Sequence, residues 1–219
     1  MRPDQFVARL RQERASAILR THDLEIARKA MEAAVRGGFR AIEFTLTIPH
    51  AMELISEFSR RPDLVVGAGT VLTVEQVREA VRAGARFLVS PVTDEAVIAA
   101  ASALGVASIP GTFTPTEMVR AHAAGATLIK LFPAPGIGPH YVRQVLGPLP
   151  HLKIIPTAGV DAANAAAYLE AGAWAVGFVA SLFAPDDLAA GRFDKVEERA
   201  RQLRAAVAAA VNKPAEPPC

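Results

Sequence analysis

The chain has 219 residues, of which 51% are hydrophobic and 21% charged, so it can bury the core of one full domain and is not disordered. Its 24 basic and 22 acidic residues leave a formal net charge of +2 without any basic block, which argues against nucleic acid as a partner. The sequence contains no apolar run of the roughly 18 residues that a membrane span needs. Its first residues mix charges with apolar residues at helical spacing, unlike the apolar core of a signal peptide, so we expect an unexported protein. The single cysteine, Cys219, excludes an intrachain disulfide, so we expect a cytoplasmic protein. Since no membrane-spanning run is present, we also expect no membrane partner.

One pattern repeats along the chain: a short apolar run typical of a β-strand, a turn, an alanine-rich helical stretch and a glycine at the helix end. Eight such runs are predicted as strands, at residues 16–20, 41–46, 64–70, 87–91, 107–112, 128–133, 153–159 and 175–181. Eight βα units close naturally into a barrel.

An open doubly wound sheet is the alternative fold, since it uses the same alternation. No GxGxxG motif follows the first predicted strand, and the chain instead reaches Asp23, a typical helix N-cap residue. Polar residues also end several strands, as in barrels that carry their chemistry at that rim. We therefore predict a single α/β domain, a (β/α)₈ barrel over residues 1–212. Within it, residues 1–14 form an extra helix across the barrel bottom, and residues 213–219 follow as a flexible tail.

Lys130 is the first candidate for chemistry, because it lies inside an otherwise apolar strand. Only five of the 24 basic residues are lysines, so an amine inside a strand stands out against the arginines used elsewhere. Burial lowers the pKa of a lysine and leaves a neutral nucleophile that can form a Schiff base with a ketone. The alternative is a lysine that reaches solvent or pairs with a carboxylate. Lys153 begins its strand and is expected to be structural.

Glu43 is the second candidate, since it is flanked by apolar residues in a predicted strand. Strand periodicity places Glu43, Thr45 and Thr47 on one side and their neighbours on the other. An inward Glu43 opposite an inward Lys130 could shuttle protons through a bound water molecule. A buried ion pair without chemistry is the alternative.

The remaining candidates are weaker signals at the same rim. Thr70 ends a GlyAlaGlyThr segment and could bind a ligand or cap the next helix; Arg20 could bind a carboxylate or lie on the surface. The segment 157–161 lies where barrels often hold phosphate. The five histidines have no metal-ligand spacing, so no metal site is predicted.

Six segments together resemble one family, the 2-keto-3-deoxy-6-phosphogluconate aldolases, in order and spacing from about residue 9 to 204. They are Glu43 in IleGluPheThrLeuThr, GlyAlaGlyThr at 67–70, ValSerPro at 89–91, IleProGlyThr at 109–112, LysLeuPhePro at 130–133 and ProThrAlaGlyVal at 156–160. The resemblance implies a homotrimeric class I aldolase that needs neither a metal nor an organic cofactor. Its 2-keto acid substrate, 2-keto-3-deoxy-6-phosphogluconate, would yield pyruvate and glyceraldehyde 3-phosphate. Related members cleave 4-hydroxy-2-oxoglutarate to pyruvate and glyoxylate.

The resemblance also implies roles for individual residues. Lys130 would form the Schiff base, and Glu43 would act as acid and base through water. The positions that match the family's substrate-binding residues are Arg20 and Thr70 on the carboxylate side, Pro91 and Phe132 at the pocket wall, and Thr157 at the distal hydroxyl chain.

Two departures from the family pattern affect substrate binding. Thr47 stands where many relatives carry arginine, so the carboxylate contact would rest more heavily on Arg20. The phosphate cradle of the family uses GlyGly and Gly-Ser, whereas the corresponding positions here are Ala158–Gly159 and Val179–Ala180, followed by Ser181. We assign Ala158, Gly159, Ala180 and Ser181 to the phosphate site.

Bulky groups beside these amides weaken dianion binding, so two alternative functions stay open. One is an aldolase for an unphosphorylated 2-oxo acid. The other is a non-catalytic barrel that binds sugar phosphates or serves as a structural oligomer.

Overall fold

The computed structural model describes residues 1–134 and 136–211. The expected tail at 213–219 and the last residue of the expected barrel domain, 212, lie outside this part of the chain. Helices and strands alternate in the order α1 Pro3–Glu13, β1 Ala15–Leu19, α2 Leu24–Arg36, β2 Ala41–Thr45, α3 Ala51–Ser59, β3 Val65–Gly69, α4 Val74–Arg82, β4 Phe87–Val89, α5 Glu95–Ala103, β5 Ala107–Ile109, β6 Gly111–Thr112, α6 Pro115–Ala123, β7 Ile129–Leu131, α7 Pro139–Leu146, β8 Ile154–Pro156, α8 Ala165–Glu170, β9 Val176–Phe178, α9 Pro185–Ala189 and α10 Phe193–Val211.

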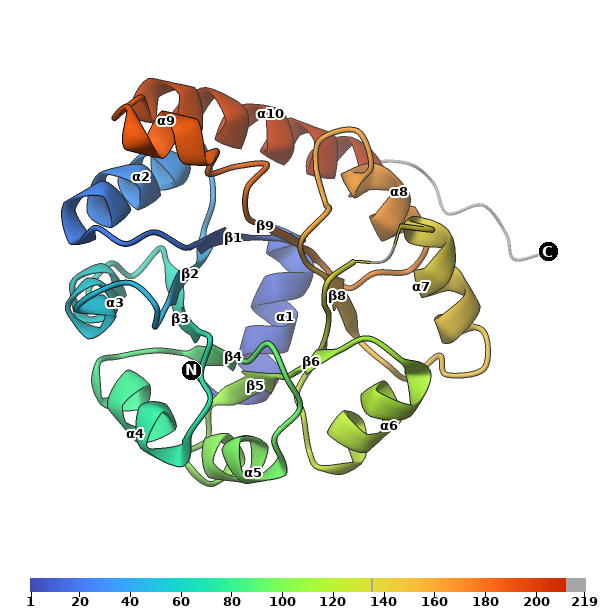
Figure 1. Cartoon of the computed structure of the whole chain (residues 1–219). Helices are drawn as coiled ribbons and strands as arrows, with labels where there is room; N and C mark the ends of the chain where they lie inside the picture. Colours follow the sequence, from blue (N-terminus) through green and yellow to red (C-terminus); the bar gives the residue numbers. More distant parts are fainter. Residues whose placement is uncertain (135, 212–219) are drawn as a thin grey trace.

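The strands form a closed ring of parallel neighbours with the helices outside it (Figure 1). One sheet has the order β5-β4-β3-β2-β1-β9 and the other β6-β7-β8. The predicted fifth strand is interrupted at Pro110, which has no N–H to donate, so β5 pairs with β4 while β6 pairs with β7. A parallel bridge between Thr157 and Gly177 joins β8 to β9 on the other side. All eight predicted strands are present, and the barrel prediction is confirmed.

Two apolar cores follow from the period-2 alternation of the strands. The outer core packs one face of the strands against the helices. Some helices begin at a side-chain cap, such as α2, where the Asp23 carboxylate accepts a hydrogen bond of 2.8 Å from the Ile26 amide. The predicted N-cap at Asp23 is therefore present. The inner core fills the barrel with apolar side chains from the other face of the strands, which range in size from Ala41 to Phe87. Polar residues inside the barrel are few, so each must have a partner or a purpose.

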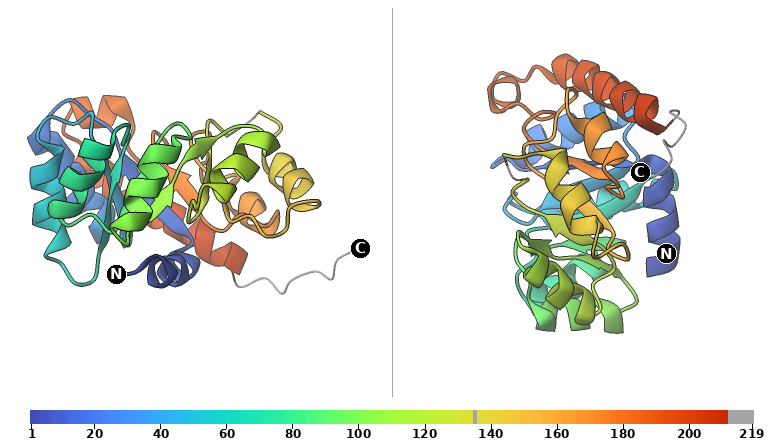
Figure 2. Two further views of the ribbon diagram at one scale, coloured as in Figure 1. Left: turned by 90° about the horizontal axis from the view of Figure 1, so that it is seen from below. Right: turned by 90° about the vertical axis from the view of Figure 1, so that its right-hand side faces the viewer.

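Helix α1 closes the bottom of the barrel, as predicted for residues 1–14 (Figure 2). Its Phe6 and Leu10 are buried in the inner core, and the Phe6 ring stacks on Phe87 with centroids 4.8 Å apart. Trp174 donates a hydrogen bond of 3.3 Å from Nε1 to the carbonyl oxygen of Val7. The Lys153 amine lies 5.6 Å from the Trp174 ring centroid at this same end, in agreement with the structural role expected for it.

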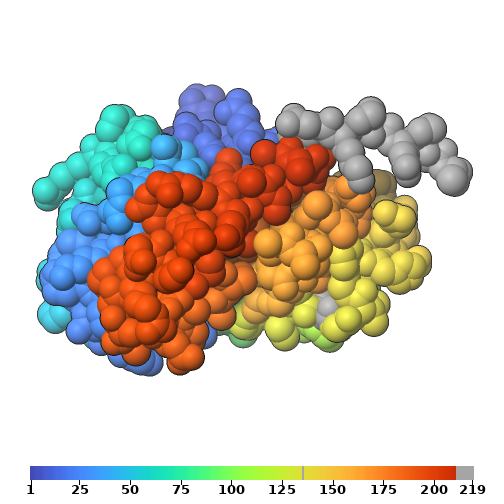
Figure 3. All heavy atoms as spheres, turned by 90° about the horizontal axis from the view of Figure 1, so that it is seen from above, coloured from blue at the N-terminus to red at the C-terminus, as the bar shows by residue number. Residues whose placement is uncertain are grey.

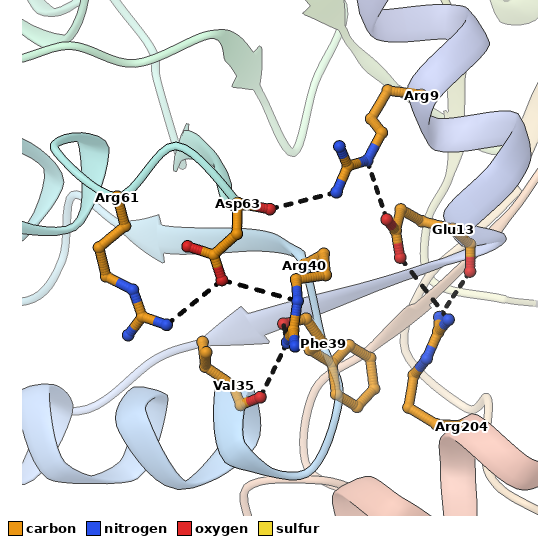
Figure 4. Close-up of polar contacts among 8 residues, drawn as sticks. All are labelled: Arg9, Glu13, Val35, Phe39, Arg40, Arg61, Asp63 and Arg204. Atoms are coloured by element: carbon orange, nitrogen blue, oxygen red, sulfur yellow. Dashed lines mark hydrogen bonds and ion pairs between the residues drawn. The ribbon is translucent and has the colours of Figure 1, made fainter.

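A polar network holds α1 in place (Figure 4). Glu13 accepts a hydrogen bond of 2.8 Å from Arg9, and its carboxylate lies 3.6 Å from the guanidinium of Arg204 on α10. Arg204 also donates to the Glu13 carbonyl oxygen at 2.5 Å, and burial lowers the pKa of Arg204. Helix α10 itself packs between α2 and α8 (Figure 3). The plug at the bottom is thus tied to the C-terminal helix, which leaves the opposite rim as the entrance.

None of the helices within the described ranges combines the length and the apolar character needed to cross a bilayer.

Candidate active site

Lys130 lies in β7 with its amine directed into the barrel. The side chain is 7% exposed and lines an inner cavity, and the amine lies 4.6 Å from the centroid of the Phe132 ring. The Lys130 carbonyl accepts a hydrogen bond of 3.0 Å from the Thr112 hydroxyl on the neighbouring strand β6, which fixes the strand that carries the lysine. The amine is therefore buried beside Phe132, which is itself only half-buried.

Glu43 lies in β2 and is 2% exposed. Its carboxylate occupies the space beside Gly69, where any side-chain carbon on residue 69 would overlap it. The second glycine of the GlyAlaGlyThr segment thus makes room for a carboxylate on the neighbouring strand. The alternation predicted from sequence is present, since Glu43 lines the same inner cavity as Lys130.

The two groups are coupled electrostatically without touching. Burial raises the pKa of Glu43, and the positive charges of Lys130 and Arg20 only partly oppose this effect. Burial also lowers the pKa of Lys130, Glu43 raises it, and Arg20 lowers it further. Among the described residues, no ion pair within 4.0 Å joins Glu43 to Lys130. The two side chains therefore lie in one cavity without a direct ion pair, and burial disfavours the charged form of each.

The structure brings the predicted carboxylate-side residues to the same rim. Arg20 follows the end of β1, is exposed, and is close enough to influence the charges of both Glu43 and Lys130. Thr70 follows β3 with a backbone φ of 59°, a left-handed conformation that is rare for threonine and common at functional sites. The next helix is capped by Thr73, so the capping role considered for Thr70 is wrong. Thr47 is exposed, and its hydroxyl lies 2.8 Å from that of Thr45.

Pro91 and Phe132 line one pocket at this rim, next to Thr112. Further lining residues were not identified from the sequence, among them Phe113, Glu117 and Arg120. Their only sequence signal is that they follow IleProGlyThr closely, and a helix-surface Glu or Arg is too common to single out.

Thr157 is buried beside the barrel axis, across from Gly177. A side-chain carbon on Gly177 would come within 2.7 Å of the Thr157 hydroxyl, so the glycine makes space for it. Thr157 also lines the cavity that contains Glu43 and Lys130. This residue therefore belongs to the interior as well as to the rim.

The loops predicted to hold phosphate also meet at this rim. Ala158 and Gly159 have φ values of 63° and 84°, and Ser181 donates a hydrogen bond of 2.7 Å to the carbonyl oxygen of Val160. That bond ties the loop after β9 to the loop after β8. Ala180 is exposed at the turn, while Val179 accepts hydrogen bonds from two following amides. The Ser181 hydroxyl is therefore already engaged by the protein.

No group of three or more His, Cys, Asp and Glu side chains within residues 1–134 and 136–211 is arranged to hold a metal ion.

Comparison with known proteins identifies the family. The family model "KDPG and KHG aldolase" matches residues 6–199. The chain belongs to this aldolase family. KDPG is 2-keto-3-deoxy-6-phosphogluconate and KHG is 4-hydroxy-2-oxoglutarate. Members are pyruvate-dependent class I aldolases, so this aldolase is a carbon–carbon lyase whose chemistry passes through a lysine Schiff base.

Individual relatives of this aldolase carry two related substrate names. It is 38% identical over 172 residues to the probable 2-dehydro-3-deoxy-6-phosphogalactonate aldolase of Rhizobium meliloti, covering 77% of this chain and 81% of the relative. It is 32% identical over 201 residues to the 2-dehydro-3-deoxy-phosphogluconate aldolase of Pseudoalteromonas atlantica, covering 87% and 90%. The Legionella pneumophila KDPG aldolase, solved with pyruvate captured as a covalent carbinolamine, superposes with a TM-score of 0.80 at 26% identity over 93% of this chain and 98% of that one.

Proposed function

We propose that this aldolase cleaves 2-keto-3-deoxy-6-phosphogluconate to pyruvate and glyceraldehyde 3-phosphate, with Lys130 as the Schiff-base residue. The observation that carries the proposal is the arrangement of Lys130 and Glu43, two buried groups that line one cavity without a direct ion pair. A lysine held in a salt bridge would stay protonated, whereas an amine whose pKa is lowered by burial is available as a nucleophile.

The reaction then follows in balanced steps. The neutral amine of Lys130 adds to the C2 ketone to give a neutral carbinolamine. Protonated Glu43 gives its proton through a water molecule to the departing hydroxyl group, so water leaves, a protonated imine remains and Glu43 is ionised. Glu43, acting through a water molecule, removes the proton of the C4 hydroxyl while the C3–C4 bond breaks. The bonding electrons move to the imine nitrogen as an enamine, and the aldehyde leaves. The same water returns a proton to C3, and hydrolysis of the imine releases pyruvate and frees the lysine.

Binding of the pyruvyl end is assigned to the rim next to these groups. Arg20 would pair with the carboxylate, because a guanidinium matches a carboxylate bidentately. Thr70 and Thr47 would add hydroxyl contacts on that side. Thr47 takes a position where many relatives have arginine, so the charge in the site comes from Arg20.

The rest of the substrate would extend along the rim. Pro91 and Phe132 would form the pocket wall, and Thr157 would contact the distal hydroxyl chain. The phosphate would lie at the loops of Ala158, Gly159, Ala180 and Ser181, on backbone amides.

A second candidate substrate differs from the first in stereochemistry. The relative with 38% identity is named for the phosphogalactonate substrate, which differs from the phosphogluconate compound in the configuration at C4. Both compounds give the same two products. Cleavage of 4-hydroxy-2-oxoglutarate, or specificity for an unphosphorylated 2-oxo acid, is a further possibility, because Val179 and Ala180 replace the small residues of the phosphate cradle.

Trapping the imine tests the proposal. Borohydride added with pyruvate should modify the enzyme at Lys130 alone, detected as the mass of one 1-carboxyethyl group on the peptide that contains it. A non-catalytic barrel would show no pyruvate-dependent modification, which would overturn the proposal. Values of kcat/KM for the two phosphorylated epimers and for 4-hydroxy-2-oxoglutarate would then rank the substrates, and a preference for the last would refute the phosphogluconate assignment.

We also propose that the protein works as a homotrimer in the cytoplasm. Apolar side chains exposed on the rim helices and loops support an assembly, among them Leu72, Val92 and Phe113. Light scattering of the purified protein would give the mass of three chains, and a monomeric mass would exclude the trimer.

A further inference from the structure

The cavity inside the barrel contains one polar group that the proposed reaction does not use. Its eleven lining residues include seven apolar side chains that come from α1 and the inner core. The four polar ones are Ser16, Glu43, Lys130 and Thr157. Glu43 and Lys130 are the reacting groups, and Thr157 sits at the junction of β8 and β9. Ser16 is left without an assigned role.

Ser16 is buried in β1 with an unpartnered hydroxyl. The residue is 7% exposed, and its Oγ has no hydrogen-bond partner. It lies in register with Gly177, the same residue that bridges to Thr157, so the two hydroxyl-bearing residues flank one glycine. A buried hydroxyl without a partner costs free energy, so a serine at this position needs an explanation.

The cavity that Ser16 lines is large enough for one water molecule, and its lining is mostly apolar, with four polar residues among the eleven. Such a site requires two to four polar neighbours, and Ser16, Thr157 and Glu43 are among the polar residues that line this cavity. Phe6 and Leu10 of α1 close the cavity on the side away from the rim. A water molecule here would be enclosed by the barrel and would approach Glu43 from below, on the side opposite the substrate entrance.

We propose that Ser16 and Thr157 hold an internal water molecule that donates a hydrogen bond to the Glu43 carboxylate, which makes Ser16 a positioning residue for the base. The inference rests on the base role proposed for Glu43. A hydrogen bond to the charged form favours that form, so the internal water opposes the effect of burial and keeps more of Glu43 ionised. The charged groups that face Glu43 are Lys130 of β7 and Arg20 after β1, and neither is altered by a change at residue 16.

The test compares Ser16→Ala with Ser16→Thr, which keeps the hydroxyl, and with Ser108→Ala. Ser108 is a suitable control, because it is 4% exposed in β5 but lines a different pocket. The measurement is the exchange of pyruvate methyl protons with deuterated solvent as a function of pH, followed by proton NMR. This half-reaction needs the ionised base, so its acidic limb reports the pKa of Glu43.

Ser16→Ala should move the acidic limb upward by on the order of one pH unit, while Ser16→Thr and Ser108→Ala keep the wild-type profile. Pyruvate trapping at Lys130 should be unchanged in all three variants. Failed trapping in the wild-type enzyme would refute the proposed function, so the two proposals fail by different results. Coincident profiles of Ser16→Ala and wild type would overturn the inference.

Thermal stability supplies a readout that does not depend on activity. A dry, unpartnered hydroxyl is unfavourable, so replacing it by alanine would raise Tm. A hydroxyl that binds an internal water loses that hydrogen bond on replacement, so we expect Ser16→Ala to lower Tm. A raised Tm would mean that Ser16 faces a dry cavity and would also overturn the inference.

Discussion

The carboxylate of Glu43 occupies the space that a side chain on Gly69 would need. The two residues lie on neighbouring strands, β2 and β3, and both line the upper part of the barrel. The glycine is therefore required by a group on another strand. Gly69→Ala should displace the Glu43 carboxylate and slow pyruvate methyl exchange by about 10²-fold, the range of general acid–base catalysis, while borohydride trapping at Lys130 persists.

Gly67→Ala is the matched control for that change. A side chain at residue 67 would overlap the Phe87 ring instead of Glu43. Both variants overpack the barrel and should lose roughly 1–3 kcal/mol of unfolding free energy in denaturant titration. If Gly67→Ala slowed exchange as much as Gly69→Ala does, the effect would come from general disruption and not from Glu43.

Lys130→Arg should abolish turnover and leave the fold intact. The guanidinium keeps a positive charge near Glu43 but stays protonated, so it cannot form an imine. Circular dichroism checks the fold, and a coupled assay for released pyruvate checks the activity. Retention of more than a small fraction of kcat would rule out Lys130 as the Schiff-base residue.

Glu43→Gln should slow proton transfer while leaving the amine in place. We expect exchange at the pyruvate methyl group to fall by about 10²-fold or more, because the amide cannot accept a proton. Imine formation should also become slower in stopped-flow trapping. Wild-type exchange rates in Glu43→Gln would remove the carboxylate from the mechanism.

Arg20→Met should shift the pH dependence in a defined direction. The Arg20 charge lowers the pKa of both Glu43 and Lys130, so its removal should raise both. The base then ionises at higher pH and the amine becomes neutral at higher pH. Both changes move the rising, acidic side of the profile to higher pH, by less than about one pH unit for an exposed charge. The profile of kcat/KM against pH for the retro-aldol reaction measures this, with Arg20→Lys as the charge-retaining control. A downward shift would contradict the electrostatic assignment.

The double change Val179→Gly with Ala180→Ser should lower KM for the phosphorylated substrate by about tenfold, since each recovered charge-assisted hydrogen bond contributes roughly 1.5–3 kcal/mol. The KM for 4-hydroxy-2-oxoglutarate should change little. A raised KM for the phosphorylated substrate would mean that Ser181, which donates a hydrogen bond to the Val160 carbonyl, already takes the place of the serine in the family's phosphate site. Equal small effects on both substrates would mean that this rim does not bind phosphate.

The local pattern of the chain determined the strands, the barrel and the alternation that sets Glu43, Thr45 and Thr47 on one face of their segment. These features depend on period-2 alternation and on short βα units, both of which are properties of neighbouring residues. The plug formed by α1 was also predictable, because Phe6 and Leu10 share one helical face.

Only the tertiary structure decided how those residues meet. The interruption at Pro110, the carboxylate beside Gly69, the gap between Glu43 and Lys130 and the orphan hydroxyl of Ser16 all depend on distances between strands that are far apart in sequence. A serine among apolar residues looks like a tolerated core position until the strands that surround it are known. Burial and charge coupling are set by those neighbours, so the pKa values of the reacting groups follow from the closed barrel and not from the strand that carries each of them.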